Sequence, residues 1–406
     1  MRRHGRIAAA ALAAGALLTS AACSGTPTSV PRAAAVATPE SPGATVRALT
    51  PAVAEQLDKA VTQTLHQAGV PGVIVGVWIP GKGSYVRAFG VADKSSGAPM
   101  SDGLRMRIGS ETKTFTVTAI LRLVDEGKVG LDDPVSKYVE GVPNGDRITL
   151  RQLADMRSGL YPYTDDPDFG KAFLSDPDRR FTPQQLLDYA FKHPVGFEPG
   201  QKFQYSNTNA ILLGLVVEKA SGQSFGDYLQ QHVLEPSHLD HTLFPTGTEF
   251  PQPHARGYTT QTLGGEVADA TNWDPSWAWA AGAMISDLSD LREWARIAAT
   301  GTLLKPATQA QRLRTLPTGF PGASYGLGIF NSHGWIGHNG SLPGYQSVTV
   351  YLPSAEATLV ILTNTDTSYE NNENSTLFAK AVTGIVTPGN VYDVPPTSAS
   401  SASPSP

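Results

Sequence analysis

The sequence has little cysteine, little charge and no basic stripe. Its single cysteine, Cys23, excludes an intramolecular disulfide. Only 17% of the 406 residues are charged and 40% are hydrophobic, so the chain can bury a large core and is not typical of a disordered protein. With a formal net charge of -5 and no basic stripe, the chain is not expected to bind nucleic acid.

The first residues have the pattern of an export signal. Three arginines within the first six residues precede an alanine-rich apolar segment at 7–18, and small residues follow at 20–22. The apolar segment is shorter than the roughly 20 residues that a membrane-spanning helix requires. We therefore expect residues 1–22 to be a signal peptide and the remaining chain to be exported.

Cys23 stands where this signal would be cut. The segment resembles a bacterial lipoprotein cleavage site, although Ser20 occupies a position that normally carries leucine. The resemblance implies a lipid on Cys23 and attachment at the outer face of a membrane. The alternatives are a free thiol, or removal of Cys23 with the signal and secretion of the chain.

Composition divides the rest of the chain into three parts. Residues 23–50 are rich in Ser, Thr, Pro and Ala without periodicity, which predicts a disordered envelope linker. Residues 389–406 are rich in Pro and Ser, which predicts a disordered tail. The segment 51–388 is left as one folded domain.

Strand patterns occupy both ends of that domain, and helix patterns occupy its middle. Apolar residues at every fourth position predict a first helix that ends at Gly69, and a hairpin follows at 72–79 and 84–91. Toward the C-terminus we predict strands and a last helix, at 325–330, 346–352, 358–363 and 375–382. This order predicts an α/β fold of the α+β type: an antiparallel sheet from both chain ends, flanked by terminal helices, with a large mainly helical lobe inserted.

The most apolar helical pattern, Met106–Gly130, begins with a reactive pair. Ser110 and Lys113 are three residues apart, so the amine can reach the hydroxyl on one helix face. Lys113 is the one lysine in the sequence with serine three positions before it. It can act as a base only when neutral, which burial or a proton-accepting partner would allow. The pair predicts an activated serine nucleophile.

Two further segments supply what such a nucleophile needs. Tyr205 and Asn207 precede a predicted helix, where a phenol can carry a proton to the leaving group and an amide can hold the substrate. Gly340 and Ser341 follow His338 between two predicted strands, where glycine lets a ligand approach the backbone. We expect the backbone N–H groups at the serine and at Ser341 to bind the oxyanion.

Taken together, these segments make residues 51–385 resemble the serine penicillin-recognising superfamily, in the group that holds class C β-lactamases, related esterases and the Streptomyces-type D-alanyl-D-alanine carboxypeptidase. The segments RSGLYPYT, PGQKFQYSNTNAILLGLVVEKASG, SWAWAAGAMIS and YGLGIF occur in the family's order. By this resemblance Ser110 is the acylated nucleophile, Lys113 and Tyr205 are its proton-transfer partners, and Asn207 contacts the substrate.

The resemblance also implies the walls of the cleft. Trp277 and Tyr161 match aromatic residues of the family's cleft, and His338 stands where lactamases have lysine and the carboxypeptidases have histidine. One departure concerns Phe330, because the carboxypeptidase has an arginine there that holds the terminal carboxylate. A phenyl ring cannot form charge-assisted hydrogen bonds with a carboxylate. We therefore expect the specificity to depend on the surroundings of Phe330.

The predicted function is that of an extracytoplasmic serine hydrolase without metal or cofactor. A D-alanyl-D-alanine carboxypeptidase-like activity on cell-wall peptides is the first choice. The alternatives are an esterase, a weak β-lactamase, or a penicillin or muropeptide sensor that is acylated without turnover. Expected substrates are therefore D-Ala-D-Ala peptides, β-lactams or esters. His238 and His241 have a possible metal spacing but no HExxH pattern or acidic companions in sequence, so we expect them to be solvated.

Overall fold

The computed structural model describes residues 45–394. The predicted signal peptide, Cys23, most of the predicted linker and the last part of the predicted tail lie outside the described residues. Among those that are described, no helix has the length and apolar character needed to cross a membrane.

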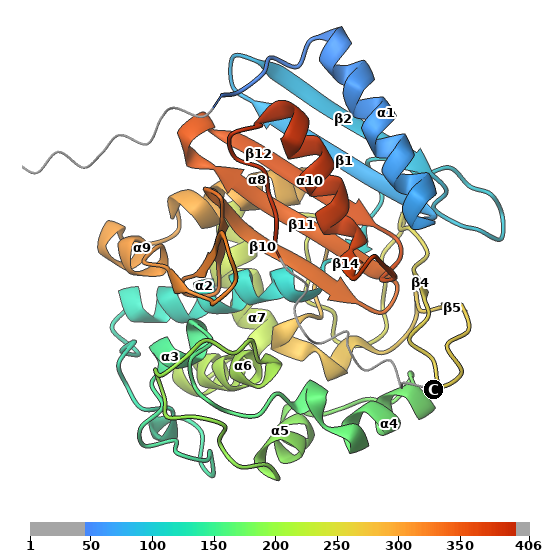
Figure 1. Cartoon of the computed structure of the whole chain (residues 1–406). Helices are drawn as coiled ribbons and strands as arrows, with labels where there is room; N and C mark the ends of the chain where they lie inside the picture. Colours follow the sequence, from blue (N-terminus) through green and yellow to red (C-terminus); the bar gives the residue numbers. More distant parts are fainter. Residues whose placement is uncertain (1–44, 395–406) are drawn as a thin grey trace, which may run out of the picture. The chain divides into compact units, whose positions relative to one another are not determined.

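One eight-stranded antiparallel sheet is built from both ends of the domain (Figure 1). Neighbouring strands follow the order β2-β1-β12-β11-β10-β9-β8-β7. From the N-terminal side come β1 (Gly72–Ile79) and β2 (Gly83–Gly90). The C-terminal side supplies the others: β7 (Leu316–Pro317), β8 (Ala323–Tyr325), β9 (Phe330–Ser332), β10 (Trp335–Leu342), β11 (Tyr345–Leu352) and β12 (Ala357–Thr363).

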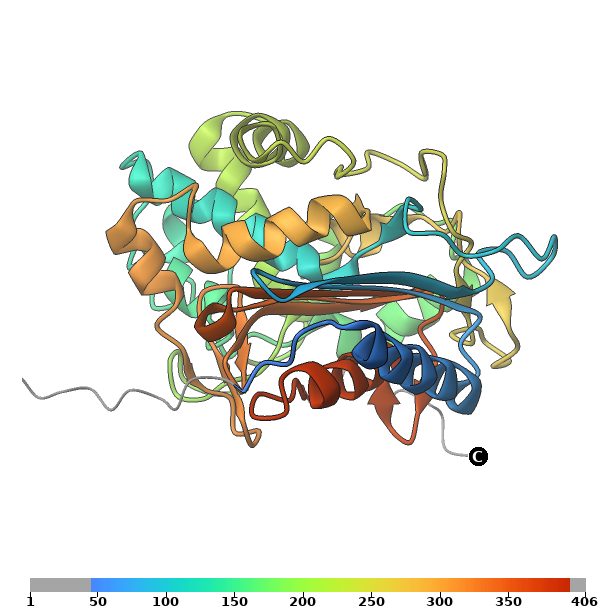
Figure 2. The same cartoon turned by 90° about the horizontal axis from the view of Figure 1, so that it is seen from above.

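The sheet separates two helical layers (Figure 2). On one face lie the terminal helices, α1 (Pro51–Ala68) and α10 (Asn374–Val386), which pack against each other. Toward the other face lies the helical lobe, with the following helices: α2 (Thr112–Asp125), α3 (Leu150–Ala154), α4 (Pro167–Ser175), α5 (Pro183–Phe191), α6 (Asn207–Ser221), α7 (Phe225–Leu229), α8 (Leu288–Thr300) and α9 (Pro306–Arg312). The predicted fold class is confirmed.

Three two-stranded ribbons complete the strands. The first pairs β3 (Met106–Arg107) with β6 (Ile285–Ser286), and thereby ties the segment before α2 to the segment before α8. The other two are the pairs β4 (Tyr258–Thr259) with β5 (Ala268–Asp269), and β13 (Ser368–Tyr369) with β14 (Asn372–Glu373).

Helix α2 lies in the middle of the lobe and is buried on nearly all sides, as its apolar pattern predicts. It contacts α6, and α8 packs across β10, β11 and β12. Phe115 of α2 stacks on Trp294 of α8 with ring centroids 3.9 Å apart. Because a helix buried all round cannot shift without disrupting many contacts, α2 is a rigid base for the residues at its start.

Two details of the prediction need correction. The strand predicted at 325–330 is divided into β8 and β9, because a tight turn lies between them with Gly328 at a φ of +65°. The packed chain also extends past the expected domain ends. Leu49 packs on the α1 and α10 layer, and Tyr392 and Val394 are buried in the same apolar cluster. Apolar side chains among many Pro, Ser and Thr residues are enough to anchor these short segments.

Candidate active site

The turn that carries Ser110 is a short 3-10 helix, Gly109–Glu111, directly before α2. Gly109 has a φ of +53°, a left-handed conformation that glycine adopts without strain. A Cβ atom there would lie 2.6 Å from the backbone nitrogen of Ser341. The absence of a side chain at this glycine therefore lets the turn lie against β10 beside the Ser341 N–H.

Close backbone packing holds the other side of this turn as well. A Cβ atom on Gly340 would clash with the carbonyl oxygen of Ile108, and the Ser347 hydroxyl donates a hydrogen bond to that same oxygen at 3.0 Å. The sequence suggested that Gly340 admits a ligand, but here it admits the Ser110 turn. The turn is thus docked on β10 and β11 by contacts that tolerate no added atom.

Lys113 lies one helical turn after Ser110, at the start of α2, and is buried. Its Nζ is 2.9 Å from the Ser110 hydroxyl and donates a hydrogen bond to the Ala281 carbonyl at 2.7 Å. Burial lowers the pKa of Lys113 well below its usual value, because the charged ammonium form loses its hydration. A neutral amine in this position can accept the Ser110 proton, which is the requirement for a base.

Tyr205 closes the site from the segment before α6. Its ring centroid is 4.8 Å from Nζ of Lys113. Burial raises the pKa of the Tyr205 phenol, while the nearby Ser110 hydroxyl opposes that shift. Even so, the phenol has no hydrogen bond of good geometry within residues 45–394. Two groups whose pKa values move in opposite directions favour Lys113 as the base and Tyr205 as the acid.

His338, on β10, is buried and makes hydrogen bonds at both ring nitrogens. Its Nδ1 lies 2.5 Å from the Asn339 carbonyl, and its Nε2 lies 3.1 Å from the Tyr325 hydroxyl. Burial is the largest cause that lowers the pKa of His338 to about 3. The imidazole therefore contributes no positive charge to the site at neutral pH.

Phe330 does not face an open cleft. Only 3% of the residue is exposed, and its ring packs edge-on against Tyr325 at 4.5 Å and lies 5.0 Å from the His338 ring. The surroundings of Phe330, on which we expect the specificity to depend, are thus the Tyr325 and His338 rings. The side chain encloses His338 and acts on the site through it.

The remaining predicted site residues lie around the start of α6. Asn207 is the first residue of α6, is 9% exposed, and its Oδ1 has no hydrogen-bond partner in the described chain. Tyr163 links Trp277 to the site. Its hydroxyl donates a hydrogen bond to the Trp277 carbonyl at 2.6 Å, and the residue lies near Tyr205. Tyr161 stacks on His193 with ring centroids 3.8 Å apart.

The structure thus brings Ser110, Lys113 and Tyr205 together, with His338, Gly340 and Ser341 beside them. Within residues 45–394, Trp277 and Tyr161 make no hydrogen bond or ring contact with the first three. The sequence did not reveal the Ala281 carbonyl, the Tyr325 hydroxyl or the buried Glu111 carboxyl. Their positions depend on strand pairing and loop packing, for which no local motif exists.

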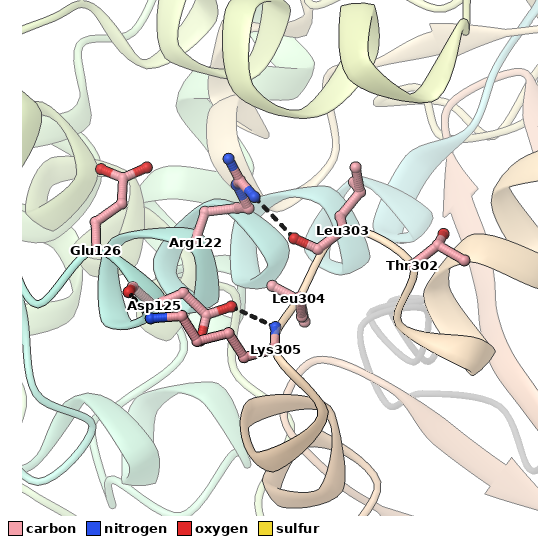
Figure 3. Close-up of a pocket in the computed structure, with 7 residues that line it drawn as sticks. All are labelled: Arg122, Asp125, Glu126, Thr302, Leu303, Leu304 and Lys305. Carbon is pink, nitrogen blue, oxygen red and sulfur yellow. Dashed lines mark hydrogen bonds between the residues drawn. The ribbon is translucent and has the colours of Figure 1, made fainter.

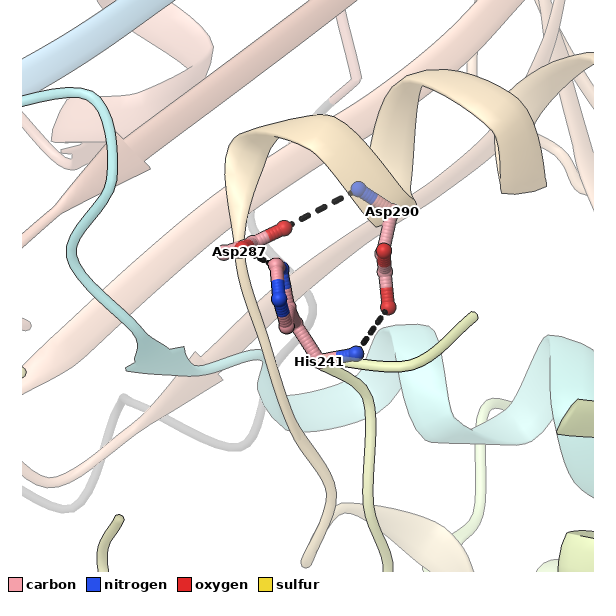
Figure 4. A group of neighbouring side chains, drawn as sticks. All are labelled: His241, Asp287 and Asp290. Carbon is pink, nitrogen blue, oxygen red and sulfur yellow. Dashed lines mark hydrogen bonds and ion pairs between the residues drawn. The ribbon is translucent and has the colours of Figure 1, made fainter. Parts of the chain in front are cut away.

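A cavity and a cluster of potential metal ligands lie outside the site. A cavity of about 340 Å³ lies at the end of α2, where Arg122 donates to the Leu303 carbonyl and Asp125 accepts from Lys305 (Figure 3). His241, Asp287 and Asp290 lie close enough together to hold a metal ion (Figure 4).

The carboxylates of the second feature already have structural partners. Asp287 caps α8 by accepting from the Asp290 N–H at 3.0 Å, and it lies 2.6 Å from Nδ1 of His241. Asp290 accepts from the His241 N–H at 2.8 Å. His241 is exposed, as expected, but it also has acidic partners that the sequence did not show. Its acidic partners come from a distant helix, and helix capping explains the cluster without a metal.

A serine within hydrogen-bond distance of a lysine at the start of a buried helix, beside an antiparallel sheet of this topology, is the arrangement of the serine β-lactamase and penicillin-binding superfamily. The protein belongs to the beta-lactamase family, since the family model described as Beta-lactamase matches residues 57–382. The resemblance noted in the sequence is thereby confirmed at the level of the family.

Named relatives are similar over most of this chain. Protein flp of Staphylococcus aureus (strain N315) is 28% identical over 331 residues, which make up 78% of this chain and 64% of that protein. The chain therefore spans less than two thirds of that relative. The putative penicillin-binding protein PbpX of Bacillus subtilis (strain 168) is 24% identical over 281 residues, or 68% of this chain and 66% of that protein.

Solved structures with the same fold include two enzymes named for D-configured substrates. A D-stereospecific amidohydrolase from Streptomyces sp. is 33% identical, with a TM-score of 0.70, and the match covers 78% of this chain and 94% of that one. The D-amino acid amidase from Ochrobactrum anthropi SV3, complexed with D-phenylalanine, is 27% identical with a TM-score of 0.73, covering 82% and 97%.

Proposed function

We propose that this protein hydrolyses amide or ester bonds that follow a D-configured residue, through an acyl-enzyme at Ser110, and that it prefers substrates whose leaving group carries no carboxylate. The observation that carries this proposal is that the side chains of His338 on β10 and Phe330 on β9 are both uncharged. His338 is neutral with both nitrogens engaged, and Phe330 occupies the position expected for an arginine. The names of the amidohydrolase and the amidase support the D configuration.

In the proposed mechanism, Lys113 accepts the proton of Ser110 as the hydroxyl oxygen attacks the substrate carbonyl. The N–H groups of Ser110 and Ser341 are placed to stabilise the oxyanion that forms. Tyr205 gives its proton to the leaving nitrogen or oxygen and recovers one from Lys113, so that both groups return to their starting states. A water molecule then attacks the acyl-enzyme ester, the same groups transfer protons in the reverse direction, and the acid product and free Ser110 are released.

A D-alanyl-D-alanine carboxypeptidase is the second candidate, because the histidine at 338 matches that group by resemblance and a relative is named as a putative penicillin-binding protein. Its substrate ends in a free carboxylate, for which a cationic partner is expected. In the described chain, the basic side chain hydrogen-bonded to Ser110 is Lys113, and burial favours its uncharged amine, which cannot pair with a carboxylate. This is why we place the amide or ester substrate first.

We also propose that the protein is exported and that Cys23 carries the lipid that holds it at the envelope. Support comes from the N-terminal sequence pattern. Inhibition of lipoprotein signal peptidase provides the test: the precursor should accumulate at a larger size. A Cys23→Ala variant should leave the membrane fraction while keeping its activity.

The catalytic proposal is tested with purified protein and four substrates: D-phenylalanine amide, L-phenylalanine amide, a D-Ala-D-Ala peptide and a nitrophenyl ester. We expect cleavage of the D-amide and the ester, with little cleavage of the L-amide. Ser110→Ala is the matched control and should cleave none of them. Release of D-alanine from the peptide faster than ammonia from the D-amide would reverse the order of the two candidates.

Penicillin provides a test that does not depend on the choice of substrate. Intact mass after incubation should show a penicilloyl adduct on the wild-type protein and none on Ser110→Ala. An adduct that persists in an enzyme without turnover on any of the four substrates would instead support a sensor. Rapid loss of the adduct with release of hydrolysed penicillin would support a β-lactamase.

A further inference from the structure

Glu111, the residue directly after the nucleophile, is buried without a strong partner. Only 1% of the residue is exposed, and neither carboxyl oxygen has a hydrogen bond of good geometry within residues 45–394. An isolated carboxylate in such a place costs several kcal/mol, and proteins usually avoid that cost by keeping the group protonated. A buried carboxyl beside a reacting serine therefore needs an explanation that goes beyond packing.

The groups that face Glu111 are neutral. Ser347 and Thr349, both on β11, are the hydroxyl side chains closest to the carboxyl. Tyr392, from the segment after α10, is the other titratable group whose ionisation is linked to Glu111. His338 is the cross-strand neighbour of Thr349 and is uncharged. Among residues 45–394, the groups that favour the carboxylate of Glu111 are the Ser347 and Thr349 hydroxyls, and burial outweighs them.

The direction of the hydrogen bonds decides which partner holds the proton. Ser347 donates its one hydroxyl hydrogen to the Ile108 carbonyl at 3.0 Å, so toward Glu111 it can only accept. A carboxylate is also an acceptor, and two acceptors cannot bond to each other. The contact between Glu111 and Ser347 is consequently favourable when Glu111 carries a proton. The Thr349 hydroxyl has no other partner in the described chain and can donate to the second carboxyl oxygen in either state.

We propose that Glu111 is a positioning residue that works as a neutral acid: it donates to the Ser347 hydroxyl, which donates to the Ile108 carbonyl, and the chain of bonds holds the Ser110 turn on β10 and β11. Loss of the proton removes the donor. It also places a negative charge next to Ser110, where the oxyanion must form. This role deepens the proposed acyl transfer at Ser110 and rests on it.

The first test is the pH dependence of acylation by a chromogenic penicillin or nitrophenyl ester, in wild type and in Glu111→Gln. Burial raises the pKa of Glu111 to about 8, so the wild-type rate should fall above that pH. The glutamine amide keeps a donor and cannot ionise. We expect Glu111→Gln to react within about threefold of the wild type at neutral pH and to lack that decline. An unchanged alkaline decline in the variant would overturn the proposal.

A second test does not use activity. Between the usual glutamate pKa and the raised one, the folded state holds a proton that the unfolded state has lost. The free energy of unfolding should therefore fall as pH rises from 4.5 to about 8, and level off above that. Glu111→Gln should fall less over the same range. Parallel curves for the two proteins would show that Glu111 is ionised when folded, contrary to the proposal.

Ser347→Ala keeps the test open if Glu111→Gln does not fold. This variant removes the Ser347 hydroxyl that accepts the proposed hydrogen bond from Glu111. The infrared C=O stretch of the protonated Glu111 carboxyl should therefore shift relative to wild type. An unshifted band would contradict the Glu111 to Ser347 hydrogen bond. The stability and infrared results separate the two proposals. If they appear as expected but no substrate or penicillin reacts, the proposed function fails and the neutral Glu111 stands.

Discussion

The Tyr325 hydroxyl and Nε2 of His338 lie 3.1 Å apart, and this bond fixes the chemical state of the histidine. Nδ1 faces the Asn339 carbonyl, which can only accept, so Nδ1 carries the ring proton. Nε2 is then the acceptor for Tyr325. The two contacts thus engage both nitrogens of the neutral ring and select the tautomer with the proton on Nδ1.

Tyr325→Phe should therefore destabilise the fold without charging His338. Removing the hydroxyl leaves the buried Nε2 without its hydrogen-bond partner, while burial, the largest cause of the lowered pKa of His338, is kept. We expect the free energy of unfolding to fall by about 1–3 kcal/mol and the imidazole to stay neutral at neutral pH. Urea denaturation and an NMR titration of the His338 ring measure the two effects.

Tyr228→Phe is the matched control for that variant. Tyr228, in α7, is also fully buried, but its hydroxyl has no hydrogen-bond partner in the described chain. The same atom is removed without loss of a bond, so the free energy of unfolding should stay within about 1 kcal/mol of the wild type. If Tyr325→Phe were equally stable, the Tyr325 hydroxyl would not be bonded to His338.

Tyr205→Phe should separate activity from stability. The phenol is buried and makes no good hydrogen bond, so its removal relieves an unsatisfied polar group. We expect the free energy of unfolding to stay equal or to rise by up to about 1 kcal/mol, while the rate of acyl transfer falls by about 10² to 10⁴ through loss of the acid. Urea denaturation and intact-mass time courses measure the two effects. A variant that is less stable yet fully active would contradict the assigned role.

Gly340→Ala tests the docking of the Ser110 turn on the sheet. The added methyl group would clash with the Ile108 carbonyl, so the turn must move away from β10. A displacement of about 1 Å at the reacting groups can cost about 10² in rate, and we expect at least that loss in penicillin acylation. Gly384→Ala is the control: nothing lies within 4 Å of the added atom in α10, so it should stabilise by about 0.5–1 kcal/mol and leave acylation unchanged.

Much of the fold could be predicted because its signals are local. Thr149 and Thr182 form capping boxes at the starts of α3 and α5 with residues three positions later, and Gly69 ends α1 in a left-handed conformation. The all-round apolar pattern of α2 correctly indicated a buried helix. Ser110 and Lys113 could be found for the same reason, since one helical turn separates them.

What escaped prediction depends on segments far apart in the chain. The division between β8 and β9 arises because Gly328 turns beneath α2, where an added Cβ would meet Val117 and the Lys113 carbonyl. No periodicity in the sequence reports that contact. The state of His338 likewise depends on Tyr325 from another strand, and the neutral surroundings of Glu111 depend on β11.

The position of Phe330 gives a test of where specificity is determined. If an arginine at this point of the sequence were enough for carboxylate recognition, Phe330→Arg would create a carboxypeptidase. Its side chain, however, would enter the buried space beside Tyr325 and His338, where Arg312 already acts as a buried cation and Asp155 is the acidic group that acts on Tyr325. An unpaired buried charge is among the most destabilising changes a protein can receive.

We therefore expect Phe330→Arg to lower the free energy of unfolding by about 3–4 kcal/mol and to gain no cleavage of D-Ala-D-Ala peptides. Phe330→Leu, which keeps the site apolar and removes part of the ring, should cost about 1–2 kcal/mol and retain the wild-type order of substrates. Urea denaturation and the ratio of kcat/KM for the peptide acid and its amide measure both effects. A stable Phe330→Arg protein with a tenfold gain on the free acid would show that this side chain reaches the substrate, and that the enclosed position of Phe330 does not limit specificity.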